Sequence, residues 1–276
     1  MFKKSIMVLS HPDDEVLWFS SILEKVDEVV ICYLGCRSKP DWAEGRRQSI
    51  AEHPIKHITC LGMDESEVFK GADWQNPVVT KYGIEIINKN LSYSRYRENY
   101  HILKKHLTGI LPNFENVFTH NPWGEYGNEE HVQLYRVIRE LRDNMNFNLW
   151  FSSYCSNQSS SLLFRYISGF DNCYATFRTN KDLAEEAMKL YKRHNCWTWY
   201  DDWEWFNEES FMKDKVSPAE MKRYGHIFPL NLIKFNYPGV PKEETRQSRV
   251  RTAPLRSYLG RILRKSGLRR KRIPES

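Results

Sequence analysis

The stretch SIMVLSHPDDE, residues 5–15, runs from an apolar segment straight into a polar turn. Its apolar half, Ser5–Leu9, has the length and composition of a buried strand. Beyond the turn, apolar side chains recur at helical spacing, at Val16, Phe19, Leu23 and Val26. A strand, a turn and a helix in this order favour an α/β protein, in which helices cover a mostly parallel sheet.

The same alternation continues through the first half of the chain. Four more apolar runs have the character of buried strands: Val29–Leu34, His57–Leu61, Asn116–Thr119 and Leu149–Ser153. Helical spacing places Leu134, Ile138 and Leu141 on one face of a helix. Pro54 is expected to end a further helix that contains Arg46–Ala51.

The pattern weakens after Tyr154, where we expect an irregular C-terminal region. Ser156–Ser161 is a serine-rich break, whereas Asp182–Arg193 is predicted to be a helix with Asn180 as its N-cap. Two weakly patterned segments are candidates for the wall of a pocket, Asp64–Tyr93 and Trp197–Phe206. In the second, aromatic side chains alternate with acids. We favour a packed cluster there, because aromatic side chains are usually core, and a wall that stacks on sugars is the alternative.

The composition is that of a globular protein with a basic tail. The chain has 276 residues, 41% of them hydrophobic, and no apolar run approaches the roughly 18 residues that span a bilayer. Residues 242–276 hold 12 basic and 3 acidic side chains, whereas the rest of the chain has a net charge of −3. We therefore expect a folded domain over residues 1–240 and a basic tail over residues 241–276. The six cysteines form no CxxC motif, which favours a reducing, cytoplasmic setting.

The turn after the first strand carries one imidazole and adjacent carboxylates. In an open parallel sheet, ligands bind beyond the carboxyl ends of the strands, so this turn lies where a site is expected. His11 and Asp14, three residues apart across a turn fixed by Pro12, are placed to share one metal ion. Asp13 would point elsewhere, free to hold a water. The alternative is that the acidic residues only cap the following helix and interact with its dipole.

A second polar loop, THNPWGEYGNEEH, residues 119–131, also follows a predicted strand and enters a helix. His131 falls in the first turn of that helix, and on its own it would be interpreted as a core histidine. Beside the first loop it completes a His-Asp-His set with His11 and Asp14. Three protein ligands plus a water are the arrangement of a catalytic zinc site, where the pKa of the bound water is about 7.

Together the two motifs resemble those of the PIG-L/LmbE-like zinc-dependent deacetylases, which include N-acetylglucosaminyl-phosphatidylinositol deacetylases. The HPDDE motif of that family is intact at His11–Glu15, and its second loop corresponds to His120–His131. The resemblance implies a Rossmann-like α/β fold with helices on both faces. It also implies hydrolysis of an N-acetyl group from an amino sugar or glycoconjugate, which releases acetate and a free amine. The implied cofactor is Zn²⁺, or another divalent first-row metal, held by His11, Asp14 and His131.

The resemblance also assigns roles beside the metal. Asp13 corresponds to the general base that takes a proton from water, and Tyr126 to the tyrosine that supports the oxyanion or the leaving amine. The usual histidine three residues before the last ligand is replaced by Asn128, whose amide supplies no proton near neutral pH. His120 and His194 are candidates for the missing acid.

These departures leave alternatives open. Glu130 stands where the family usually has Asp, and Asn128 is a good N-cap that would serve the fold alone. The leading hypothesis is a zinc-dependent deacetylase. One alternative is a catalytically impaired metal-binding relative that acts as a scaffold or binding protein, and another is a hydrolase of a different amide or ester. The intact HPDDE motif favours an enzyme, because a protein that only binds has no use for Asp13.

The basic tail has a pattern of its own. Apolar residues recur at helical spacing, at Leu255, Tyr258, Leu259, Ile262 and Leu263, with basic residues between and after them. A basic amphipathic helix lies on anionic membrane surfaces. We therefore expect a cytoplasmic protein that binds the inner face of a membrane peripherally, with a solvated or partner-docked tail as the alternative. Nucleic acid is an unfavoured partner, because no recognition motif accompanies the charge.

Overall fold

The computed structural model describes residues 2–167, 170–214 and 228–235. The domain boundary expected near residue 240 and the expected amphipathic helix of the tail both lie outside these residues. Within the described part of the chain, no helix combines the length and the apolar character needed to cross a membrane.

A seven-stranded mixed sheet forms the centre of the fold, in the order β3-β2-β1-β6-β7-β10-β9. The first five strands in this order are parallel: β3 Ile58–Asp64, β2 Glu28–Gly35, β1 Ser5–Leu9, β6 Asn116–Thr119 and β7 Asn148–Ser152. They confirm the five predicted strands, with small differences at the ends. Two antiparallel strands, β10 (Glu208–Asp214) and β9 (Phe170–Arg178), extend the sheet beyond β7.

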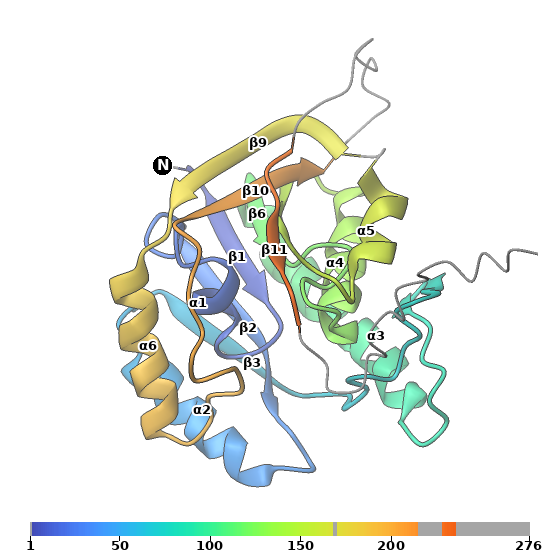
Figure 1. Cartoon of the computed structure of the whole chain (residues 1–276), viewed down its shortest axis with the longest axis horizontal. Coiled ribbons are helices and arrows are strands. Elements are labelled where there is room, and N and C mark those ends of the chain that lie inside the picture. The colour runs from blue at the N-terminus through green and yellow to red at the C-terminus, as the bar shows by residue number, and fades with distance from the viewer. Residues whose placement is uncertain (1, 168–169, 215–227, 236–276) are drawn as a thin grey trace, which may run out of the picture. The chain divides into compact units, whose positions relative to one another are not determined.

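Helices cover both faces of this sheet (Figure 1). One face carries α1 (Asp14–Trp18), α2 (Pro40–Glu52) and α6 (Lys181–Arg193), and the other carries α3 (Tyr93–Ile110), α4 (Glu129–Arg142) and α5 (Ser160–Tyr166). Strand β1 shows why two layers are needed. Ile6 and Val8 belong to the core beneath α3 and α4, whereas Met7 and Leu9 belong to the core beneath α1 and α6. A strand that is apolar at every position must be covered on both faces, and the predicted fold class is confirmed.

The remaining elements are short. The chain makes a 3₁₀ turn after α3, and its other strands form two-stranded pairs. The turn and strands are Leu111–Asn113, β4 Val79–Thr80, β5 Gly83–Ile84, β8 Tyr154–Ser156 and β11 Asn231–Ile233. The pair β4–β5 lies in the segment Asp64–Tyr93, which is otherwise irregular, as its lack of a period indicated.

The first helix is much shorter than its apolar spacing predicted. It ends at Trp18, and the chain continues to Val26 in turns, although the predicted apolar side chains are buried as expected. The backbone N–H of Ser21 donates to Glu209 Oε2 at 2.8 Å, and Ser20 Oγ contacts the other carboxylate oxygen at 3.3 Å. These bonds hold the turn after α1 against strand β10 of the sheet.

Between Tyr154 and Asp214 the chain is more regular than its weak pattern indicated. The segment contains β8, α5, β9 and β10, and the predicted serine-rich break includes the turn at residues 157–159 between β8 and α5. Strand β10 escaped prediction because it buries Glu209, whose carboxylate also accepts a hydrogen bond from Tyr154 Oη at 3.0 Å. Helix α6 is confirmed, and the side chain of Asn180 caps it by accepting from the N–H of Leu183.

Candidate metal centre

Two polar loops begin side by side at the carboxyl edge of the sheet. Strands β1 and β6 are parallel neighbours, with Val8 opposite Thr119. The loop after β1 carries His11 to Asp14, and the loop after β6 leads to His131 at the start of α4. The pairing of these two strands therefore brings together the two motifs that the sequence singled out.

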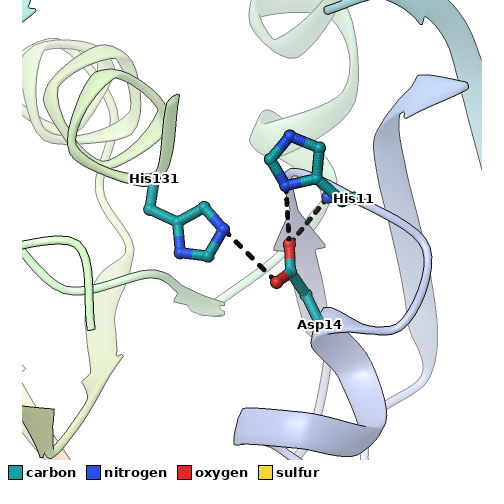
Figure 2. A group of neighbouring side chains, drawn as sticks. All are labelled: His11, Asp14 and His131. Carbon is teal, nitrogen blue, oxygen red and sulfur yellow. Dashed lines mark hydrogen bonds and ion pairs between the residues drawn. The ribbon is translucent and has the colours of Figure 1, made fainter. Parts of the chain in front are cut away.

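The three predicted ligands converge (Figure 2). One atom from each of His11, Asp14 and His131 lies within 4.8 Å of the other two. His131 Nε2 is 3.3 Å from Asp14 Oδ1, and His11 Nδ1 is 3.4 Å from Asp14 Oδ2. All three side chains are buried. Despite burial, the neighbouring His131 and His120 hold the pKa of Asp14 well below its usual range, so this carboxyl group is ionised.

The donor atoms of this cluster fit a metal ion. His131 Nδ1 is 2.8 Å from Glu125 Oε2, and because a carboxylate only accepts, Nδ1 carries a proton and Nε2 is the nitrogen left for a metal. Nε2 is buried without a hydrogen-bond partner and faces an oxygen of Asp14. When Nε2 carries no proton, a metal ion between these two atoms would bind the lone pairs of both. Ligand atoms that lie about 2.1 Å from a tetrahedral zinc are roughly 3.4 Å apart, and the distances from each histidine to an oxygen of Asp14, 3.3 and 3.4 Å, are of this size.

The other nitrogen of His11 is oriented by Glu130. His11 Nε2 is 2.8 Å from Glu130 Oε2, while the backbone N–H and hydroxyl of Ser66 both donate to Oε1 at 2.6 Å. With the Nε2 proton bound to Glu130, Nδ1 is the nitrogen left for a metal. Carboxylates commonly orient metal-binding imidazoles in this way, so Glu130 can act as such a partner although it departs from the family's usual Asp.

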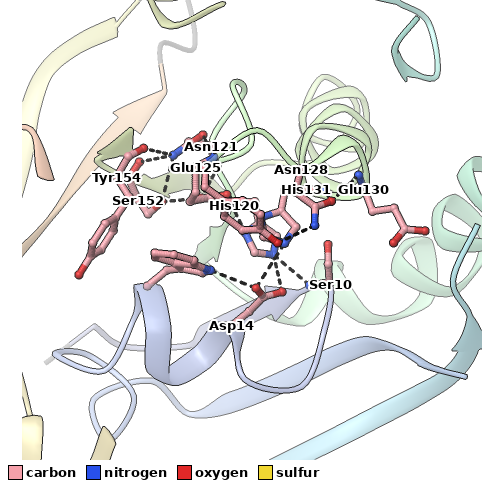
Figure 3. Close-up of polar contacts among 12 residues, drawn as sticks. Ser10, Asp14, His120, Asn121, Glu125, Asn128, Glu130, His131, Ser152 and Tyr154 are labelled. Carbon is pink, nitrogen blue, oxygen red and sulfur yellow. Dashed lines mark hydrogen bonds and ion pairs between the residues drawn. The ribbon is translucent and has the colours of Figure 1, made fainter. Parts of the chain in front are cut away.

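Glu125 lies behind the cluster and joins two histidines (Figure 3). Its Oε2 is 3.1 Å from His120 Nδ1 as well as 2.8 Å from His131 Nδ1, and the two imidazoles stack with centroids 3.6 Å apart. The N–H of Ser10 donates to His120 Nε2 at 3.0 Å. Despite burial, His120 and His131 lower the pKa of Glu125 to about 2. His120, a candidate acid, is thus enclosed in the protein interior.

Asn128 has two contacts, one structural and one directed at the site. Its Oδ1 caps α4 by accepting from the N–H groups of Glu130 and His131, at 2.9 and 3.4 Å. Its Nδ2 donates to Tyr126 Oη at 2.8 Å. Gly124, with φ +67°, lets the loop close tightly, since a Cβ there would lie 2.4 Å from the carbonyl oxygen of Asn128. Asn128 therefore serves more than the fold.

A cavity of about 300 Å³ opens onto the cluster and is lined by His11, Asp13, Asp14, Tyr126, Asn128 and Glu130 among others. Both segments expected to form a wall contribute, through Phe69 and Trp199. His194, the other candidate acid, caps the end of α6 and pairs with Glu52 at 3.2 Å. It is absent from the described residues that line the cavity.

Asp13 is held in an unusual conformation beside the cluster. Its φ is +97°, and its side chain is almost fully buried. Oδ2 accepts from Thr198 twice, from Oγ1 at 2.6 Å and from the N–H at 3.2 Å. Burial and the neighbouring Asp14 raise the pKa of Asp13 to about 8. Thr198 was not predicted as a site residue from the sequence. The only indication there is that it lies within the aromatic segment Trp197–Phe206.

No protein-family model matches the chain. It is 22% identical over 194 residues to an uncharacterized protein of Acanthamoeba polyphaga mimivirus, which covers 69% of this chain and 80% of that protein. The fold is similar to that of a deacetylase–teicoplanin complex from the teicoplanin biosynthesis pathway (TM-score 0.46, 11% identity, 78% and 100% of the two chains). It is also similar to a zinc-inhibited form of teicoplanin deacetylase (TM-score 0.47, 10% identity, 76% and 97%).

Proposed function

We propose that this protein is a metal-dependent deacetylase that hydrolyses the N-acetyl group of an amino sugar or glycoconjugate to acetate and a free amine. The observation that carries the proposal is the convergence of His11, Asp14 and the buried His131 Nε2, next to a cavity that His11, Asp13 and Asp14 line. The resemblance of the two loops to deacetylase motifs supports the substrate class.

The metal is proposed to be Zn²⁺, held by His11, Asp14 and His131. When bound, zinc supplies Lewis acidity, which polarises a carbonyl group and makes water a stronger acid. The chain itself orients the ligands, because Glu125 and Glu130 fix which nitrogen of each imidazole carries the proton.

Asp13 is assigned the role of general base. Its carboxylate lines the cavity, and Thr198 holds one oxygen, which leaves the other available to a water. Burial raises the pKa of Asp13 to about 8 in the chain without a metal. A carboxylate with this pKa is a stronger base than an exposed one. Asp13 takes a proton from the attacking water, whose oxygen bonds to the amide carbonyl carbon. The C–N bond then breaks, and Asp13 returns the proton to the leaving nitrogen.

Tyr126 is assigned to the oxyanion. Burial raises the pKa of its phenol well above its usual value, so the hydroxyl keeps its proton. Its oxygen already accepts a hydrogen bond from Asn128. The O–H is therefore left to donate into the cavity, where negative charge develops on the carbonyl oxygen.

Two measurements test this function, metal content and acetate release. We expect the purified protein to contain about one zinc per chain and to release acetate from N-acetylglucosamine conjugates. Asp13→Asn should keep the zinc and lose roughly 10²- to 10⁴-fold in kcat, the contribution of a general base. His131→Ala should lose the metal. Full activity of Asp13→Asn would contradict the base role, and a metal-loaded protein without turnover on any N-acetylated sugar would favour the binding-protein alternative.

A further inference from the structure

Five aromatic rings form a continuous strip that starts in the cavity and leads out of it: Phe69, Tyr126, Trp199, Tyr200 and Phe235. We call this the aromatic strip. Centroids of successive rings are between 4.7 and 6.1 Å apart. The rings come from four separate segments of the chain. The strip is therefore assembled by folding and is more than a local cluster of the sequence.

Much of the aromatic strip is exposed. Phe69 and Tyr200 are 49% and 53% exposed, and Trp199 is half-buried between them and the core. At the inner end, Phe69, Tyr126 and Trp199 line the same cavity as Asp13. Contiguous exposed apolar surface that joins a cavity is typical of a ligand-binding surface.

The size of the cavity shows why a ligand would reach the strip. Its volume, about 300 Å³, is at the lower end of the range of roughly 300–1,000 Å³ that encloses a drug-sized molecule. A substrate much larger than one hexose must therefore extend outside the cavity. The aromatic strip provides a surface for that extension.

The chemistry of the strip favours a sugar. The faces of aromatic rings are electronegative, and the C–H bonds on one face of a pyranose ring present partial positive charge to them. Asp202 and Glu204, close to Tyr200 in the sequence, are exposed carboxylates that accept hydrogen bonds from hydroxyl groups. An acyl chain would make no such bonds. We propose that the aromatic strip binds a second sugar residue of a saccharide chain, next to the residue whose amide enters the cavity; this rests on the proposed function.

Binding of neutral sugars that carry no amide tests the proposal. We would titrate the full-length protein calorimetrically with glucose, cellotriose and maltotriose. At least one trisaccharide should bind roughly tenfold or more tightly than glucose, and Tyr200→Ala should weaken that trisaccharide about tenfold. The matched control is Tyr174→Ala, because Tyr174 is 47% exposed on β9, outside the strip. It should bind the trisaccharide like the wild type.

Two results would overturn the proposal: neither trisaccharide binds more tightly than glucose, or Tyr200→Ala and Tyr174→Ala weaken binding equally. Since none of these sugars is a substrate, the result does not depend on the proposed reaction. Trisaccharide binding on the strip without acetate release from any N-acetylated sugar would remove the deacetylase function and keep the sugar subsite. If the protein releases acetate but Tyr200→Ala leaves trisaccharide binding unchanged, the deacetylase function is kept and the sugar subsite is removed.

Discussion

Asp13 is fixed by partners on both sides of its backbone. Its N–H donates to Glu15 Oε2 at 3.0 Å, which supports the left-handed conformation, and its carboxylate accepts from Thr198. A non-glycine residue with this φ costs about 1–3 kcal/mol unless its surroundings maintain it. The resemblance of the HPDDE motif led to the proposal that Asp13 is the base. It gave no information about Thr198, because a contact between positions 185 residues apart leaves no local pattern.

The hydrogen bond from Thr198 should tune the base. This bond lowers the pKa of Asp13, against the upward effects of burial and Asp14. Thr198→Val removes the donor hydroxyl, so the pKa of Asp13 should rise and the acidic limb of the kcat/KM–pH profile should move to higher pH. At neutral pH we expect roughly a 10- to 100-fold loss, the value of a hydrogen bond to a charged group. Thr198→Ser keeps the hydroxyl and should retain the wild-type profile; equal profiles for both variants would contradict the role.

Glu125 should control metal affinity without touching the metal. Its Oε2 accepts from His131 Nδ1 and thereby directs the lone pair of Nε2 to the cluster. Glu125→Gln places an amide in this position, and its N–H₂ can oppose the Nδ1 proton. We expect zinc affinity to fall about 10- to 100-fold, as for other residues that orient ligands, measured by competition with a chelator. Glu140→Gln, in the surface ion pair with Lys104, is the matched control; similar affinities for the two variants would contradict the prediction.

At the scale of the element, α4 depends on Asn128 for its start, and the site depends on the same residue. Asn128→Ala should lower the free energy of unfolding by about 1 kcal/mol through loss of the N-cap. Asn128→Asp keeps the cap but replaces the amide donor with an acceptor. The Tyr126 hydroxyl would then donate to that carboxylate and no longer to the substrate.

These two variants separate the roles of Asn128. Urea denaturation should show Asn128→Asp close to the wild type in stability and Asn128→Ala less stable. Acetate release by Asn128→Asp should have a clearly reduced kcat. If Asn128→Asp kept the full kcat, the Tyr126 proton would play no part in the reaction.

Elements could be predicted where local chemistry determined them. Strand β1 is apolar at four of its five positions, and the side chain of Asn180 marks the start of α6. Two elements depended on distant contacts instead. Strand β10 contains a buried Glu209, and that carboxylate also bonds Ser20 and Ser21 in the turn after α1. These contacts join residues almost 190 positions apart, so neither departs from the local pattern in a way that the sequence could reveal.

At the scale of the whole molecule, the site draws on loops from distant parts of the chain. The loops after β1 and β6 supply the metal cluster, because these strands are neighbours in the sheet. The segment after β3 and the segment after α6 supply the wall, through Phe69 and Trp199. The order of the parallel strands could not be read from their apolar runs alone. The motifs therefore predicted the candidate ligands, and strand order explains why they meet.

The charge of the whole chain leads to a prediction about the tail. Residues 242–276 carry a net charge of +9, opposite in sign to the rest of the chain. Each Lys or Arg near an anionic membrane contributes about 1 kcal/mol, and apolar side chains at helical spacing add to this. The full chain should therefore float with phosphatidylserine vesicles and remain unbound with neutral ones.

A chain that ends at residue 245 should not float, and its thermal unfolding midpoint serves as the control for folding. High salt should release the full chain, since the Debye length shortens to about 3 Å at 1 M. Flotation that is equal with and without the tail, or unaffected by lipid charge, would exclude this segment as the membrane contact.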